Sequence, residues 1–213
     1  KLLCKNDTSL VHFQETTYGQ SLLEWAVYIE HFEATKALAE EGANPNLQSY
    51  DGTSAFIHAA DINTTSEYVK LLLQFGGDVN AVAFNSAPKN LQRLRTPLIA
   101  AAGSNLESTK ILIENGADIN YVSKHDQSAL YSACLLLKIE IVKYLIENGA
   151  DYKRPICTTL DGELLYLTDE LRTMPFELDS EKYKIKMQVV EFLKINGMDY
   201  WKTPIPSYLY KNY

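Results

Sequence analysis

Apolar residues in this chain recur at helical spacing within short segments, and each of these segments is followed by a glycine. One apolar stripe consists of Val69, Leu72 and Leu73, and another is the run 111–113. Residues at this spacing share one face of an α-helix. A glycine after the last turn favours the positive φ that ends many helices. The pattern therefore predicts short amphipathic helices, each closed by a glycine.

The closing glycine belongs to a longer motif that repeats along the chain. Each copy has an apolar helical stretch, then glycine, a small residue and Asp or Asn, with a looser copy near the end. The glycines are Gly42, Gly76, Gly116, Gly149 and Gly197. Their spacings are 34, 40, 33 and 48 residues, with about seven extra residues in the third unit and about fifteen in the fifth. An underlying period near 33 predicts a stack of structural repeats.

A second motif begins each unit. Its strongest form is Thr96-Pro-Leu-Ile-Ala-Ala-Ala102, and weaker versions start at Ser21, Ser54 and Ser128. Hydroxyl side chains at these positions can cap a short helix, and the proline suits the first helical position. Together with the Gly-Ala-Asp-x-Asn ending, this start resembles the ankyrin repeat.

The resemblance implies an all-α ankyrin-repeat solenoid, in which helix-turn-helix repeats carry β-turn fingers. It covers about residues 16–152 well and 158–200 loosely. We expect about five repeats plus a partial N-terminal cap, and the chain is similar to bacterial stand-alone ankyrin-repeat proteins. The expected parts are a cap at 1–15, four repeats at 16–152, a degenerate fifth repeat at 153–200 and an extended tail at 201–213.

Several segments depart from the family pattern. Glu24 stands where the family favours His, and we expect this change to weaken hydrogen bonding between neighbouring turns. Residues 83–94 lack a clean period, which predicts a lengthened finger, and a second insertion is expected between 168 and 180. Asp179 or Ser180 is then expected to cap a final helix that runs to about Ile195.

Composition narrows the function. Hydrophobic residues make up 46% of the chain and charged residues 22%, as in ordered globular proteins. The net charge of −7 disfavours nucleic acid as the partner, because no basic surplus is available to neutralise phosphates. No apolar run approaches the roughly 18 residues of a membrane-spanning helix. The histidines and cysteines lack ligand spacing, and no phosphate-binding or nucleophile motif occurs, so we expect no metal, cofactor or catalysis.

Ankyrin geometry leaves the turn tips and the last turn of each first helix exposed on the concave side. Several of these positions, which would usually be polar, hold aromatic or aliphatic residues or arginine, and interfaces are enriched in aromatics and arginine. The partner-binding candidates are Tyr18, Gln20, Tyr28, Ile29, Tyr50, Asp51, Ile62, Arg93, Arg95, Lys124, His125, Leu135 and Leu136. The competing interpretation is that the insertions cover some of them, or that single exposed apolar residues have no function.

The sequence thus predicts a non-catalytic module that binds a protein partner through the concave face and the turn fingers. A narrower hypothesis, by analogy with bacterial proteins, is an immunity or inhibitor protein of the bacterial cytoplasm or periplasm. One alternative is a ligand-binding or enzymatic site formed by the two insertions, and another is a scaffold or effector fragment. We expect a monomer when free, with no nucleic acid bound and no membrane insertion.

Overall fold

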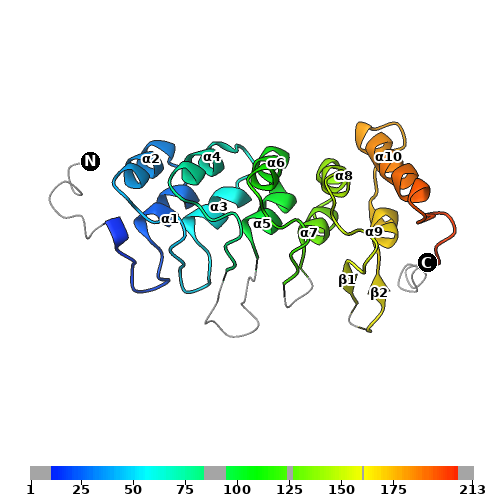
Figure 1. Ribbon diagram of the computed structural model, residues 1–213, viewed down its shortest axis with the longest axis horizontal. Coiled ribbons are helices and arrows are strands. Elements are labelled where there is room, and N and C mark those ends of the chain that lie inside the picture. Colours follow the sequence, from blue (N-terminus) through cyan, green and yellow to red (C-terminus); the bar gives the residue numbers. More distant parts are fainter. Residues whose placement is uncertain (1–10, 84–94, 124–126, 160, 206–213) are drawn as a thin grey trace.

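A computed structural model describes residues 11–83, 95–123, 127–159 and 161–205 of the chain. Within these residues five helix pairs follow one another, and Figure 1 shows them as two parallel rows with the connecting turns projecting to one side. The pairs are α1 (Leu22–Tyr28) with α2 (Phe32–Glu40), α3 (Ala55–Asp61) with α4 (Glu67–Gln74), α5 (Pro97–Ser104) with α6 (Leu106–Glu114), α7 (Ala129–Leu135) with α8 (Ile139–Glu147), and α9 (Leu167–Thr173) with α10 (Glu181–Ile195). The all-α solenoid expected from the sequence is confirmed. None of the described helices has the length and hydrophobicity needed to cross a membrane.

The first helix of each of the first four pairs begins at the predicted hydroxyl residue. The Ser21 and Ser128 side chains accept hydrogen bonds from backbone N–H groups three residues later, at 3.0 and 3.1 Å. Ser54 and Thr96 make the same contact at 3.3 Å. These bonds satisfy N–H groups that have no partner inside the helix, which explains why such short helices start where they do.

The second helices of these four pairs end at the repeat glycines with φ between 85° and 95°. A Cβ added at Gly42, Gly76, Gly116 or Gly149 would meet nothing within 4 Å. The glycine is therefore required by the left-handed backbone conformation and not by crowding.

The hydrophobic core runs continuously along the stack. Small residues such as Ala60, Ala102 and Ala133 are fully buried where successive first helices pack against one another. Leu72 and Leu112 of the second helices are also fully buried. Because each repeat buries its apolar face only against its neighbours, stability depends on the whole stack.

An asparagine at the end of one repeat binds the end of the next. The Asn80 amide donates to the Gly116 carbonyl at 3.1 Å, and its side-chain oxygen accepts from the Asp118 N–H at 2.8 Å. Asn46 and Asn120 make the same pair of bonds to the following repeats. The position is Lys153 after the fourth repeat, so the fifth repeat joins the stack without this pair of bonds.

The second insertion lies partly elsewhere than expected. Residues 167–173 form α9, the first helix of the fifth pair, and the extra length is divided between a hairpin before α9 and a connector after it. The hairpin strands β1 (Cys157–Thr158) and β2 (Leu164–Leu165) are antiparallel. Leu167 and Leu171 are fully buried, so one apolar pair anchors this helix. The prediction for α10 is confirmed, because Ser180 caps it and the helix ends at Ile195.

The chain after α10 turns back onto α9. The Arg172 guanidinium donates to the backbone carbonyls of Tyr200, Thr203 and Pro204, and pairs with the Asp169 carboxylate at 3.0 Å. It also lies 4.9 Å from the centroid of the Tyr200 ring. Arg172 thus holds the described part of the C-terminal segment against the last repeat. The N-terminal residues 1–10, expected to form a partial cap, lie outside the described residues.

Candidate protein-binding face

The candidate surface is the side formed by the first helices and the turns that precede them, which we call the inner face. Tyr18, Tyr28 and Tyr50 are each more than half exposed there, as are Ile29, Leu135 and Leu136. Asp51 is exposed, whereas Gln20 and Arg95 are half-buried. Arg93, Lys124 and His125 lie outside the described residues.

Ile62 does not behave like the other apolar candidates. It is half-buried and packs against the core, so its expected exposure is wrong. The backbone leaves the helical conformation at this residue, with φ −67° and ψ 123°, which turns the chain away from the direction that α3 would have taken. Ile62 instead lines a hollow of about 230 Å³ between α1 and α3, together with Tyr28, Glu30 and His58.

The exposed Trp25 side chain of the inner face was missed by the sequence reasoning. Trp25 is 50% exposed, and its ring centroid lies 5.6 Å from that of Tyr28. The Tyr28 ring in turn meets the His58 ring edge-on at 5.7 Å. The signal was available, since Trp25 precedes Tyr28 by three residues and so shares its helix face. Leu137 extends the run of exposed leucines at the end of α7.

The first two fingers are joined through their tyrosines. The Tyr50 N–H donates to the Tyr18 carbonyl at 2.8 Å. The Tyr50 ring lies over Gly19, where a Cβ would come within 2.6 Å of it. The close approach of ring and backbone requires glycine at this position, and it holds the two exposed tyrosines next to each other.

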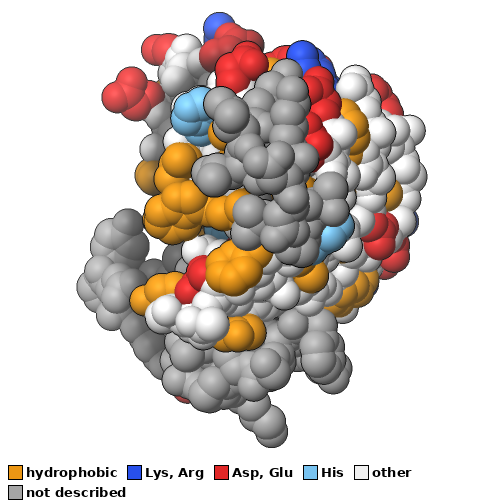
Figure 2. Space-filling view, turned by 90° about the vertical axis from the view of Figure 1, so that its left-hand side faces the viewer, with side chains coloured by type: hydrophobic (Ala, Val, Ile, Leu, Met, Phe, Trp, Pro, Cys, Tyr) orange, Lys and Arg blue, Asp and Glu red, His pale blue; other side chains and the backbone are white. Residues whose placement is uncertain are grey.

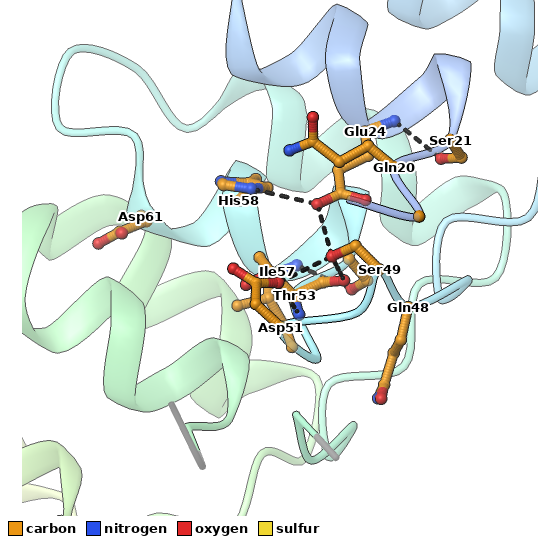
Figure 3. Close-up of polar contacts among 12 residues, drawn as sticks. Gln20, Ser21, Glu24, Gln48, Ser49, Asp51, Thr53, Ile57, His58 and Asp61 are labelled. Atoms are coloured by element: carbon orange, nitrogen blue, oxygen red, sulfur yellow. Dashed lines mark hydrogen bonds and ion pairs between the residues drawn. The ribbon is translucent and has the colours of Figure 1, made fainter. Parts of the chain in front are cut away.

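A buried polar network links the first two repeats beneath this surface (Figure 3). Glu24 is fully buried, and its Oε1 lies 3.1 Å from the Ser49 hydroxyl and 3.3 Å from His58 Nε2. Glu24 thus makes its own contacts to the next repeat through one carboxylate oxygen, in place of those expected of the family's His. The glutamate fits because a histidine of the second repeat and a finger serine both reach it.

The finger of the second repeat is fixed by Asp51. Its carboxylate accepts from the Thr53 N–H at 2.9 Å and from the Ser49 hydroxyl at 2.8 Å. Partial burial acts to raise the pKa of Asp51, but these two donors, together with the Thr53 side chain and nearby His58, outweigh it and hold that pKa below its ordinary value. The Asp51 charge is therefore retained at neutral pH at the tip of the finger.

The other end of the array holds two hollows beside the hairpin. One, of about 290 Å³, is lined by Arg154, Ile156 and Cys157 among others, and the second, of about 360 Å³, lies between Tyr166 and the chain near Thr203. The Cys157 thiol lies 3.7 Å from Glu170 Oε1. Within the segments that the structure describes, no group of three His, Cys, Asp or Glu side chains is placed to hold a metal ion.

The sequence matches the family described as ankyrin repeats (3 copies) over residues 22–120 and 81–155. The chain belongs to the ankyrin-repeat family. Protein PhlB of Serratia liquefaciens is 31% identical over 107 residues, which cover 46% of this chain and 44% of PhlB. The putative ankyrin repeat protein FPV014 of fowlpox virus (strain NVSL) is 33% identical over 129 residues, which cover 48% of this chain and 29% of that protein. The chain therefore spans less than half the length of these curated relatives.

Membership of the ankyrin-repeat family indicates what kind of role the inner face has. Ankyrin repeats generally mediate protein–protein interaction, and stacked repeats present extended concave surfaces for that purpose. In this ankyrin array several exposed apolar side chains, among them Tyr28, Leu135 and Leu136, lie on the first helices and fingers of that surface, over a buried core. The arrangement can bury apolar area against a partner without reorganising the fold.

Proposed function

We propose that this ankyrin array binds a single protein partner through its inner face and carries out no reaction on it. The observation that supports the proposal is the exposure of Tyr28 and Ile29 at one end of the face and of Leu135 and Leu136 at the other. An isolated exposed leucine means little, but the same helix-end position is apolar and exposed in two separate repeats. Burying these side chains in a complex would supply the anchors that interfaces require.

The narrower role that we propose is an inhibitor or immunity function, in which the array covers a functional surface of its partner. A preorganised solenoid suits this role, because a rigid surface loses little conformational entropy on binding. The immediate test is to purify the complex from the native source and titrate the partner's own activity with the array. Loss of that activity at a one-to-one ratio supports inhibition, and unchanged activity in a stable complex contradicts it.

The face itself is tested with two variants, Tyr28→Ala and Leu136→Ser. Each should weaken binding of the purified partner by roughly 1–3 kcal/mol, as expected for interface anchors. Ile195→Ala is a matched control, since Ile195 is 76% exposed at the end of an outer helix. Binding isotherms and melting curves are measured for all three. Unchanged affinity in both inner-face variants contradicts the proposed site, and lost stability in Leu136→Ser assigns that residue to the fold.

A further inference from the structure

The charge of the chain is concentrated in its first two repeats. Residues 11–83 contain ten Asp and Glu residues but only two lysines, which gives a net charge of −8. The whole chain has a net charge of −7, so the remaining residues contribute no net negative charge. Such an asymmetry creates a field at one end of the array that attracts cations and repels anions.

The two lysines of this region do not belong to the inner face. Lys36 lies on α2 and Lys70 on α4, which are both second helices. The inner face of the first two repeats instead carries Glu15, Glu30 and Asp51, all of them exposed or half-exposed. Figure 2 looks onto this end of the molecule, where acidic side chains outnumber basic ones.

The carboxylates of this region are held in fixed positions. Glu15 accepts hydrogen bonds from the backbone N–H groups of Thr17, Tyr18 and Gln20, and Glu30 accepts from the Thr64 hydroxyl at 3.1 Å. The neighbouring Asp61 already pairs with Arg95 at 3.0 Å. That ion pair is an example, next to this surface, of a guanidinium bonded to a carboxylate.

Exposed aromatic rings lie among these carboxylates. Trp25 and Tyr28 lie side by side on α1, and Tyr18 and Tyr50 lie on the adjoining fingers. Hydrophobic side chains gather on one side of the view in Figure 2. An aromatic face attracts a cation, and it attracts arginine most readily because the planar guanidinium can stack on the ring and bond a carboxylate at its edge.

We propose that the acidic aromatic surface of the first two repeats, made by Tyr18, Trp25, Tyr28 and Tyr50 with Glu15, Glu30 and Asp51, binds an arginine-rich segment of the partner protein. This inference rests on the proposed function and names the chemistry of its partner. The aromatic rings bind the guanidinium faces, and the carboxylates bind their N–H edges. A neutral apolar partner would cover the same carboxylates without pairing them, which costs free energy.

The probes are three labelled synthetic peptides of equal length and identical apolar residues, with arginine, lysine or serine at the same positions. Fluorescence anisotropy should rank binding as arginine, then lysine, then serine. Binding of the arginine peptide should weaken roughly tenfold between about 50 and about 500 mM NaCl, because ionic pairs are screened. An arginine peptide that does not bind at about 1 mM contradicts the inference.

Two paired charge variants separate a local site from a general field. Glu15→Gln with Glu30→Gln removes two carboxylates from the inner face, and Glu33→Gln with Glu40→Gln removes two from the outer helix α2. The first pair of substitutions should lower the affinity for the arginine peptide roughly tenfold, and the second pair should lower it less than about threefold. Equal weakening by both pairs shows that only net charge matters and contradicts the proposed site. Circular dichroism checks that every variant is folded.

Trp25→Ala and Tyr28→Ala distinguish failure of this inference from failure of the proposed function. In one outcome the serine peptide binds as tightly as the arginine peptide, and both aromatic variants weaken binding of the serine peptide. The inner face is then an interface, but its partner is not cationic. If the arginine peptide binds equally well to both aromatic variants, the binding lies elsewhere and the inner face is not the site. If the two aromatic variants weaken binding of the arginine peptide and not of the serine peptide, the result supports both this inference and the proposed function.

Discussion

The Glu24 carboxylate of the first repeat lies 3.3 Å from Nε2 of His58 in the second repeat. Glu24 is fully buried, and its second oxygen, Oε2, has no hydrogen-bond partner among the described residues. A buried carboxylate is costly unless it is paired, so the contact with His58 offsets part of the cost of burying Glu24. The His58 ring also meets the Tyr28 ring edge-on at 5.7 Å, so this network contacts the proposed binding surface.

His58→Ala should destabilise the array by roughly 1–3 kcal/mol, because it leaves the buried carboxylate with fewer partners. Glu24→Gln removes the charge at nearly constant shape and should cost less. In the double variant the loss should be smaller than the sum of the two single losses, since the unpaired charge is gone. Urea unfolding of all four proteins measures the coupling. Strictly additive losses would show that the two side chains do not interact.

The contact between Glu24 and His58 marks the limit of what the sequence could predict. Helix starts at Ser21 and Thr96 and the helix end at Gly116 follow from local chemistry, so the repeat register was predictable. Glu24 and His58 are 34 residues apart, and the sequence alone does not show that their side chains meet. The family expectation at Glu24 therefore considered only the histidine that is absent and did not include the contacts to Ser49 and His58.

The candidate surface was likewise predictable only in part. The register placed Tyr28 and Leu136 correctly, because exposure on a regular helix follows from position. It failed at Ile62, where the backbone leaves the helix one residue earlier than the pattern assumed. It also missed α9, because a seven-residue helix anchored by two leucines gives too short a periodic signal.

The asparagines between repeats provide a second test of how the stack is held together. Asn80→Ala removes two hydrogen bonds to the next repeat and should cost about 1–3 kcal/mol. Asn148→Ala is the matched control, because its amide bonds the Tyr144 carbonyl one turn earlier in the same repeat. It should cost less than about 1 kcal/mol. Equal losses in urea unfolding would show that the bonds between repeats add nothing.

The backbone at Leu137 stores strain that a substitution can release. Its φ is 55°, a left-handed conformation that costs an ordinary residue roughly 1 kcal/mol, and the equivalent residue of the first repeat, Glu30, has a φ of 52°. Leu137→Gly should therefore leave stability unchanged or raise it by up to about 1 kcal/mol. Leu136→Gly, one residue earlier at φ −98°, should instead lower it. Melting curves of the two variants compare their stability changes. If both variants lose the same stability, the backbone at Leu137 is not strained.

Glu170 beside the Cys157 thiol makes the stability of the fifth repeat depend on pH. Burial raises the pKa of Glu170 above its ordinary value, and the charge of Asp169 adds to the effect, although the Cys157 hydrogen bond opposes it. The folded chain thus holds this proton more tightly than the unfolded chain does. Its contribution to stability is complete below the pKa of an unfolded glutamate, about 4.3, and is lost as pH rises through the folded pKa.

Glu170→Gln cannot ionise, so it should match the parent near pH 4 and be more stable than the parent at pH 7. The measurement is the free energy of unfolding in urea at both pH values. Unfolding is monitored with a spectroscopic probe that reports on α9 and α10. Glu177→Gln is the control, since Glu177 is exposed on the connector after α9 and should give no comparable change between the two pH values. If the difference between parent and Glu170→Gln is the same at both pH values, Glu170 ionises equally easily in the folded and unfolded chains, and its burial adds no pH dependence to stability.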